Sequence, residues 1–431
     1  MNRIFRLSLA LNGFPIKEAV TEYGKVSRDL NLNKVLSIYE YHIKNNPFYK
    51  NFVSEFGLLD NWTDVPIISK GDFQYPVQQL LSLNFSESDL HIHNTSGSSG
   101  TPFYFAKDKF CHAMNWANMD QCLKQHGIEI GKSLQARFYG IPLGGVKYYK
   151  ERFKDFLAGR IRFPVFDLSD SNLDRILMSF KNNKFEYING YTSSLVIFAK
   201  YILEKGLCLR VVCPSLKVVF PTSEVLDDID RDILQRAFGV KIVNEYGAAE
   251  LDIIAFEDED GDWVINNKTL FVEILGDNNL PVAHGEEGRV IVTSLYNKAM
   301  PFIRYDLGDR AILSNRTKNG QQILERVVGR TNDIIKLPSG KISPGLTFYY
   351  ISKKILESGA GLKEFIVKQK ELDLFEFIYI SDIDFSVHQK REIELSMIQY
   401  LEPGLRCEFS RVERINRTKA GKLKHFISEL D

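Results

Sequence analysis

Between residues 133 and 243, short apolar segments alternate with amphipathic ones, and this alternation limits the folds open to the chain. Two of the amphipathic segments, 193–205 and 227–238, have the periodicity of helices. The strand-like runs are 133–139, 185–189, 216–220 and 240–243. Repeated strand–helix units predict an α/β fold in which crossover helices join the strands.

The segments on either side have a different character. Residues 17–85 are predicted to be helical, with breaks at Pro47, Pro66 and Pro76, and the stretch after residue 250 is predicted to be a β-rich subdomain. The last hundred residues predict a small α+β domain. Its expected elements are a helix at 345–358, strands at 364–369 and 374–380, a helix at 387–401 and a strand at 408–412. We therefore expect a large domain over 1–331 and a small one over 333–431, with the boundary near Asn332.

Charge and cysteine content exclude several classes of protein. The 431 residues include 55 Lys and Arg and 55 Asp and Glu, so no global field favours a nucleic acid or an anionic membrane. Five cysteines without a CxxC pair argue against a disulfide scaffold or a zinc ribbon and suit the cytoplasm. We expect residues 1–13 to form an ordinary helix rather than a secretory signal or surface anchor, and no later run predicts a transmembrane segment.

A loop of small residues follows the alternating run 90–93. Its members from 95 to 101 are Thr95, Ser96, Gly97, Ser98, Ser99, Gly100 and Thr101. A loop of this composition turns backbone N–H groups and hydroxyls toward one anion, which suits the phosphates of ATP. The lysine of a Walker motif is missing, because Pro102 and Phe103 follow, so a P-loop fold is disfavoured. Taken alone, the loop is equally consistent with a flexible linker.

Four further motifs follow the loop in a fixed order. They are residues 244–250 (NEYGAAE), 304–309 (RYDLGD), 329–336 (GRTNDIIK) and 417–423 (RTKAGKL). In this order and spacing the set resembles the core motifs of the acyl-adenylate-forming superfamily, over nearly the whole chain. Within it the chain is most similar to the phenylacetate-CoA ligase-like branch, which includes CapK-like proteins of capsular polysaccharide biosynthesis. Residues 46–49 and 65–70 add weaker signatures of that branch.

The resemblance implies an ATP-dependent ligase that converts a carboxylate into an acyl adenylate, releases pyrophosphate and transfers the acyl group to an acceptor. The loop at 95–101 would hold phosphate, Tyr246 and Gly247 the adenine, and Asp309 the ribose hydroxyls. Glu250 would bind Mg²⁺. Arg330 would brace the ribose or phosphate, and Lys422 would stabilise charge at the α-phosphate.

Three positions bear on how closely the chain follows this pattern. Asn332 matches the hinge about which the small domain of relatives rotates. Phe103 stands where relatives have a lysine, which removes one cation from the pyrophosphate side. Leu251 follows Glu250 where nearer relatives often have a zinc-binding cysteine, so we expect no zinc.

A metal site built from Cys111, Cys122, His112 and His126 is an alternative that fits no standard spacing. We expect His91 and His93 to line the core or a pocket.

The resemblance also places the acid pocket. Its predicted residues are Tyr139, Gly140, Tyr191, Thr192, Ser223, Glu224 and Ala248. These residues are too polar for a fatty-acid tunnel and favour a compact hydroxylated or aromatic acid. Three functions stay open: a CapK-like ligase acting on an amine or amino sugar, an aryl-CoA ligase that uses CoA, and a non-catalytic nucleotide-binding protein. Nothing in the sequence predicts the oligomeric state.

Overall fold

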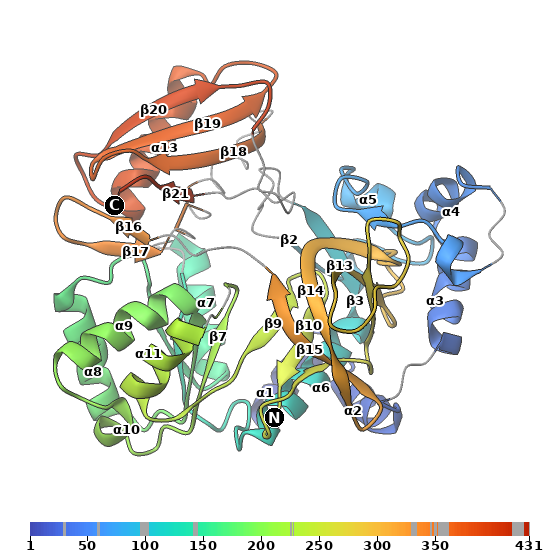
Figure 1. Ribbon diagram of the computed structural model, residues 1–431, viewed down its shortest axis with the longest axis horizontal. Coiled ribbons are helices and arrows are strands. Elements are labelled where there is room, and N and C mark those ends of the chain that lie inside the picture. The colour runs from blue at the N-terminus through green and yellow to red at the C-terminus, as the bar shows by residue number, and fades with distance from the viewer. Residues whose placement is uncertain are drawn as a thin grey trace. The chain divides into compact units, whose positions relative to one another are not determined.

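The computed structural model describes residues 1–28, 32–57, 61–94, 103–140, 145–224, 226, 228–328, 334–344, 347–348, 351, 362–415 and 426–430 (Figure 1). Backbone contacts divide the chain into two compact units. The first comprises Met1–Thr95, Phe103–Ile130 and Asn244–Gly329, and the second comprises the remainder. The predicted domain boundary at Asn332 lies outside the described residues and stays a prediction.

The N-terminal part of the first unit is helical, as predicted. Its α-helices are α1 (Arg3–Leu11), α2 (Ile16–Lys25), α3 (Leu32–Asn45), α4 (Pro47–Ser54), α5 (Val77–Leu80) and α6 (Lys109–Gln125). Side-chain caps start three of them, because the oxygens of Asn2, Asn46 and Asp108 accept the N–H groups of Phe5, Tyr49 and Cys111. None of the described helices combines the length and the apolar character that crossing a bilayer requires.

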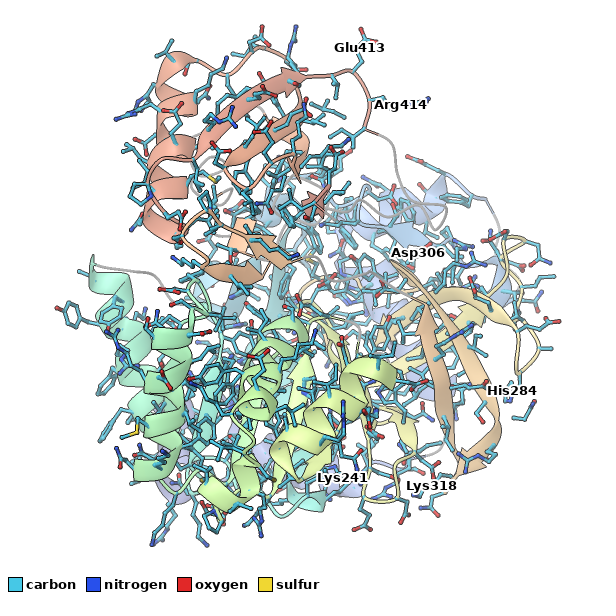
Figure 2. The ribbon with its side chains drawn as sticks, turned by 60° about the vertical axis from the view of Figure 1, so that its left-hand side comes forward. Lys241, His284, Asp306, Lys318, Glu413 and Arg414 are labelled. Carbon is cyan, nitrogen blue, oxygen red and sulfur yellow. The ribbon has the colours of Figure 1, made fainter. Side chains whose placement is uncertain are left out.

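An eight-stranded sheet forms most of the rest of the first unit, which confirms the predicted β-rich region. The strand order is β12-β13-β14-β15-β11-β10-β9, and β1 pairs with β14. The strands are β1 (Ile68–Ser69), β9 (Glu245–Ala248), β10 (Asp252–Glu257), β11 (Trp263–Ile265), β12 (Leu270–Leu275), β13 (Glu287–Ser294), β14 (Tyr305–Lys318) and β15 (Gln321–Val328). At the hairpin tip Lys318, labelled in Figure 2, forms ion pairs with Asp258, Asp260 and Asp262.

A buried arginine fixes the start of β14. Arg304 is 1% exposed and has a positive φ of 46°. Its Nη1 donates to the carbonyls of Thr63 and Val65 at 2.8 and 2.7 Å, and its Nε lies 3.4 Å from Glu273 Oε2 on β12. The Arg304 N–H also donates to Thr293 Oγ1 on β13 at 2.9 Å. One guanidinium thus ties the segment before β1 to the strands around β14.

Arg304→Ala should lower the free energy of unfolding by about 3–5 kcal/mol, because it leaves the buried Glu273 carboxylate unpaired. Arg316→Ala is the control, since Arg316 is exposed and pairs with Asp262 at the surface. It should cost about 0–1 kcal/mol. Urea unfolding measures both values, and equal losses would contradict the role assigned to Arg304.

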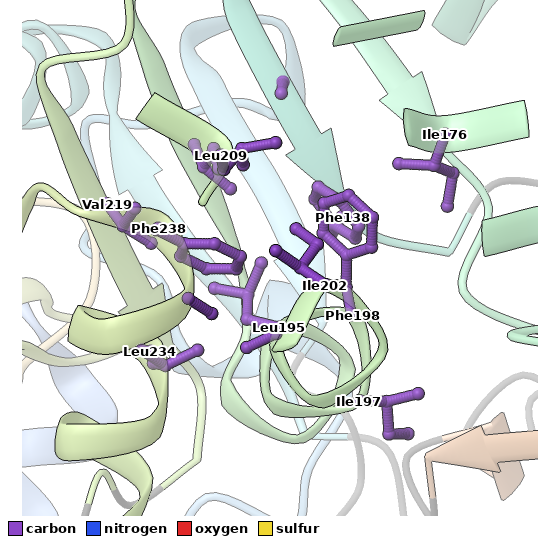
Figure 3. Close-up of a cluster of buried hydrophobic side chains, with 14 of the residues drawn as sticks. Phe138, Ile176, Leu195, Ile197, Phe198, Ile202, Leu209, Val219, Leu234 and Phe238 are labelled. Atoms are coloured by element: carbon purple, nitrogen blue, oxygen red, sulfur yellow. The ribbon is translucent and has the colours of Figure 1, made fainter. Parts of the chain in front are cut away.

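The second unit contains the predicted α/β sheet. The sheet is parallel throughout, in the order β5-β4-β6-β7-β8. Its strands are β4 (Gln135–Phe138), β5 (Arg160–Phe163), β6 (Tyr187–Tyr191), β7 (Val218–Thr222) and β8 (Lys241–Ile242). The helices are α7 (Gly145–Leu157), α8 (Asp170–Asn182), α9 (Thr192–Glu204), α10 (Leu209–Val212) and α11 (Asp228–Phe238). Side chains of α9 and α11, including Leu195, Phe198 and Phe238, form the core with Phe138 of β4 (Figure 3).

The C-terminal residues of the second unit form a small α+β layer, as predicted. A hairpin of β16 (Ile334–Lys336) and β17 (Ile342–Pro344) precedes a four-stranded sheet of order β20-β19-β18-β21. Its elements are β18 (Leu362–Gln369), β19 (Leu374–Ser381), α13 (Val387–Tyr400), β20 (Arg406–Arg411) and β21 (Phe426–Ser428). Helix α13 lies against this sheet (Figure 1), and its Ile393 and Met397 share a hydrophobic core with Val367 and Phe377 of the sheet. Most of the helix predicted at 345–358 lies outside the described residues.

Candidate functional site

An antiparallel hairpin holds both ends of the Gly/Ser/Thr loop. The hairpin consists of β2 (Leu90–Asn94) and β3 (Tyr104–Asp108), and Asn94 is paired with Tyr104 at its tip. The loop residues from Thr95 to Thr101 are outside the described residues. The strand residues on either side of them, Asn94 and Tyr104, are nevertheless paired. A loop that encloses one anion needs its two ends close together in this way.

Phe103, which stands in the place of a lysine, is a core residue. It is 1% exposed, and its ring centroid lies 5.5 Å from that of Phe73 and 6.4 Å from that of Tyr305. Phe302 completes the cluster. A lysine in this apolar surrounding would bury its ammonium, at a cost of several kcal/mol. Position 103 is therefore built for packing.

Two tyrosine–carboxylate hydrogen bonds cross between β14 and the motif of β9. Tyr246 on β9 donates its hydroxyl to Asp309 Oδ2 on β14 at 3.0 Å. In the opposite sense, Tyr305 on β14 donates to Oε1 of Glu250, just after β9, at 3.0 Å. Burial, and next the nearby Glu250 carboxylate, raise the pKa of Tyr305 well above its ordinary value, so Tyr305 stays a donor. We call this arrangement the crossed tyrosine pair.

The crossed tyrosine pair requires a strongly curved sheet. Three strands separate β14 from β9 in the sheet order. With about 4.8 Å between neighbouring strands, a flat sheet would hold them about 19 Å apart. The hydroxyl bonds show that the start of β14 and the β9 motif instead approach each other within side-chain reach. Curvature thus brings together two motifs that are about sixty residues apart in the chain.

Lys107 is a positioning residue that sequence reasoning missed. It lies on β3, six residues after the loop, and is 2% exposed. Its Nζ donates to the carbonyl of Ala249 at 2.9 Å and forms an ion pair with Asp252, so it holds the turn that carries Glu250. The available signal was a lysine inside the apolar run of a strand. Gly247 serves the same turn, since a Cβ there would lie 2.3 Å from the Asp252 carbonyl oxygen.

In the second unit, predicted pocket residues meet at the carboxyl edge of the parallel sheet. The chain leaves β4 for β5 on one side and then forms β6 on the other, so β4 and β6 flank a topological switch point. Ligands of open α/β sheets bind at such a crevice. Tyr139 follows β4 and Tyr191 ends β6, and their ring centroids are 4.6 Å apart. The guanidinium of Arg137 lies 4.2 Å from the Tyr139 ring centroid.

Glu224 lies at the same edge, after β7. Its carboxylate accepts hydrogen bonds from the N–H and Oγ of Ser193 at 2.7 and 3.0 Å, at the first turn of α9. Thr192 Oγ1 donates to the Glu224 carbonyl at 3.3 Å. Burial raises the pKa of Glu224 to about 7, against the opposing effect of the Ser193 bonds. The preceding Ser223 is exposed and has a φ of 69°, a strained value for a residue with a side chain.

Glu224→Gln should change how stability depends on pH. The folded protein retains the Glu224 proton up to about pH 7, whereas the unfolded chain releases it near the ordinary pKa of 4.5. The stability that the raised pKa of Glu224 contributes is therefore fully present below pH 4.5 and is lost as the pH rises through about 7. Unfolding curves between pH 4.5 and 8 should show the wild type losing stability relative to the variant over this window. A constant difference would be inconsistent with a raised pKa.

The remaining predicted residues divide into two groups. Gly140 follows Tyr139 at the sheet edge, and Ala248 lies on β9 with Tyr246 and Gly247. Arg330, Asn332, Lys422 and the phosphate loop lie outside the described residues, so their roles stay predictions. Glu250 fits a Mg²⁺ ligand, because a carboxylate that accepts from Tyr305 retains oxygen lone pairs for a hard cation.

The residues of the alternative metal site, Cys111, Cys122, His112 and His126, do not form a metal-binding group in the structure. Over the described ranges, no group of three or more His, Cys, Asp or Glu side chains is arranged to hold a metal ion. His112 stacks on His91 with 3.9 Å between ring centroids, and burial lowers the pKa of His112 to about 2. His91 and His93 also stack, at 6.0 Å. His91 is half-buried and His93 is exposed, so the expectation that both line the core or a pocket is wrong for His93.

Comparison with known proteins agrees with the fold and the motifs. The chain is 25% identical over 418 residues to the protein CapK of Staphylococcus aureus, covering 91% of this chain and 87% of CapK. It is 22% identical over 333 residues to a phenylacetate-coenzyme A ligase of Thermus thermophilus, covering 74% and 73%. No family model matches the chain.

A solved structure shares the fold. It is 2-hydroxyisobutyryl-CoA ligase in complex with 2-HIB-AMP and CoA, with a TM-score of 0.59 and 18% identity over 92% of this chain and 88% of that one. In its ordered motifs, along most of its length and in its fold, the chain is thus similar to the CapK-like and phenylacetate-CoA ligase-like branch of the acyl-adenylate-forming superfamily, a group of ATP-dependent, AMP-forming ligases.

Proposed function

We propose that this protein activates a small carboxylic acid with ATP, forms the acyl adenylate with release of pyrophosphate, and transfers the acyl group to a nucleophilic acceptor. The observation that carries the proposal is the crossed tyrosine pair, which holds Asp309 and Glu250 in fixed positions. The superfamily resemblance assigns these two carboxylates to the ribose and to Mg²⁺. Fixed charges of this kind accelerate a reaction whose main demand is alignment and charge stabilisation.

Each proposed residue supplies a definite interaction. Asp309 accepts both ribose hydroxyls with its two oxygens, and Tyr246 keeps that carboxylate oriented. Glu250 binds Mg²⁺, which when bound neutralises charge on the phosphate oxygens. Arg330 braces the ribose or phosphate. Lys422 stabilises charge where the carboxylate attacks the α-phosphate, while 333–431 turns about Asn332 between the two half-reactions.

The acid is proposed to bind at the switch-point edge of the parallel sheet. Tyr139 and Tyr191 offer flat aromatic surfaces, and the Thr192 to Ser193 turn with Glu224 offers polar groups. A compact acid with a ring or a hydroxyl satisfies both surfaces, whereas a long alkyl chain would leave the polar groups unpaired. We therefore propose that the substrate is a small aromatic or hydroxylated acid. We further propose that the protein acts in the cytoplasm and uses neither zinc nor a nucleic acid.

The acceptor defines two candidate functions. Similarity to CapK along most of the chain favours an amine or amino sugar in surface polysaccharide biosynthesis. Similarity to phenylacetate-coenzyme A ligases favours the thiol of CoA. We place the polysaccharide acceptor first, because the match to CapK covers more of both proteins.

Pyrophosphate release with Mg²⁺ and ATP tests the proposal. The panel contains aryl acids, small hydroxy and amino acids, and uronic acids, with hydroxylamine as a surrogate acceptor. We expect release that depends on one class of acid and that falls about 10²- to 10³-fold in Lys422→Ala. Lys419→Ala is the matched control, three positions earlier in the same segment, and should retain activity.

Further arms of this assay separate the candidates. One arm omits hydroxylamine, which would itself convert a thioester into a hydroxamate, and offers either CoA or an amine. An amide formed from the amine supports the first candidate, and a thioester formed from CoA supports the second. Nucleotide binding without pyrophosphate release for any acid would favour the non-catalytic alternative. Equal activity of Lys422→Ala and the wild type would remove Lys422 from the mechanism.

A further inference from the structure

Helix α7 attaches to the second unit by its charged side. Asp155 is buried, and its carboxylate pairs with Arg160 and, at 2.8 Å, with Arg162 of β5. Glu151, one turn earlier, lies 3.2 Å from Arg162 Nη2. The acidic side chains of α7 therefore face inward and are neutralised by arginines. Helices at protein surfaces normally turn their apolar side inward, so α7 is reversed.

The outward side of α7 carries four large apolar residues. Val146, Tyr149, Phe153 and Phe156 are 85, 73, 63 and 79% exposed. Their spacing of three, four and three residues places them on one stripe of the helix, within an arc of about 80° at about 100° per residue. An exposed patch of this kind on a folded unit marks a surface that binds something.

Cations flank the stripe. At about 100° per residue, Lys150 lies on one side of the stripe and Arg152 on the other. Both are exposed, whereas Lys154, 53% exposed, pairs with Glu151 at 2.7 Å. Because the acids of α7 are turned inward, the outward surface combines aromatic rings with positive charge. This local surface differs from the chain as a whole, whose formal net charge is zero.

We propose that the outward face of α7 adsorbs the protein to an anionic lipid surface. Aromatic and apolar side chains enter the interface between headgroups and acyl chains, and flanking Lys and Arg side chains bind the anionic headgroups. A second copy of the chain fits less well, since two such faces packed together would bring Lys150 and Arg152 against like charges. This inference does not depend on the proposed adenylation.

Vesicle co-sedimentation of the full chain tests the proposal. We expect binding to vesicles that contain phosphatidylglycerol, weaker binding to pure phosphatidylcholine vesicles, and loss of binding at high salt. Phe153→Gln with Phe156→Gln should weaken binding at least about tenfold, because both rings leave the interface. Lys150→Glu with Arg152→Glu should also weaken it.

Matched controls replace exposed residues elsewhere in the second unit. Val211→Gln with Ile229→Gln removes two apolar side chains that are 78 and 72% exposed, and Lys200→Glu reverses an exposed charge. These variants should bind vesicles as the wild type does, and all variants should unfold at the same midpoint. The proposal would be overturned if the wild type failed to bind vesicles that contain phosphatidylglycerol. A dimer in analytical ultracentrifugation that the Phe153 and Phe156 changes dissociate without any vesicle binding would also overturn it.

Discussion

Burial of the Arg304 guanidinium is the interaction on which the first unit depends. A cation 1% exposed is tolerated only where carbonyls and a carboxylate surround it, and Thr63, Val65 and Glu273 supply these groups. The contacts come from segments before β1 and on β12. These contacts of Arg304 therefore fix where β14 begins, directly before Tyr305.

From that fixed start, β14 and β9 hold each other's functional groups. Tyr305 holds Glu250, and Tyr246 holds Asp309. Tyr305 is itself packed against Phe103, two residues after the phosphate loop. Lys107, on the strand that leaves the same loop, donates a hydrogen bond to the Ala249 carbonyl in the turn that carries Glu250. The strand that follows the phosphate loop, the Glu250 turn and the Asp309 strand thus share one set of contacts within the first unit.

The layered α/β plan could be predicted because apolar periodicity is a local property. The β-rich stretch after residue 250 lies where the sequence predicts it, and β18, β19, β20 and α13 differ from their predicted bounds by one or two residues. β9 was not predicted as a strand, because Glu245–Ala248 has no alternation and pairs only through β10. The crossed tyrosine pair depends on sheet curvature, which no local pattern records.

Burial and pairing explain the other differences. From the sequence, Phe103 removes one cation from the pyrophosphate side, and this stays a prediction. Its position in an aromatic cluster could be seen only once distant residues such as Phe73 and Phe302 were placed. Lys107 gave a weak signal because its partners lie about 140 residues away. The orientation of α7 could not be predicted, because its sequence has an apolar and a charged side and the periodicity does not show which side faces inward. Only the ion pairs of Asp155 with β5 decide which side faces inward.

Binding of ATP to Asp309→Asn tests the central claim most directly. The crossed tyrosine pair is proposed to present Asp309 to the ribose, so isothermal titration should show one saturable site that the variant weakens about tenfold, the loss of one charge-assisted hydrogen bond. Asp277→Asn, an exposed aspartate of the same unit, is the control and should bind as the wild type does. Equal affinities for all three proteins would contradict the account.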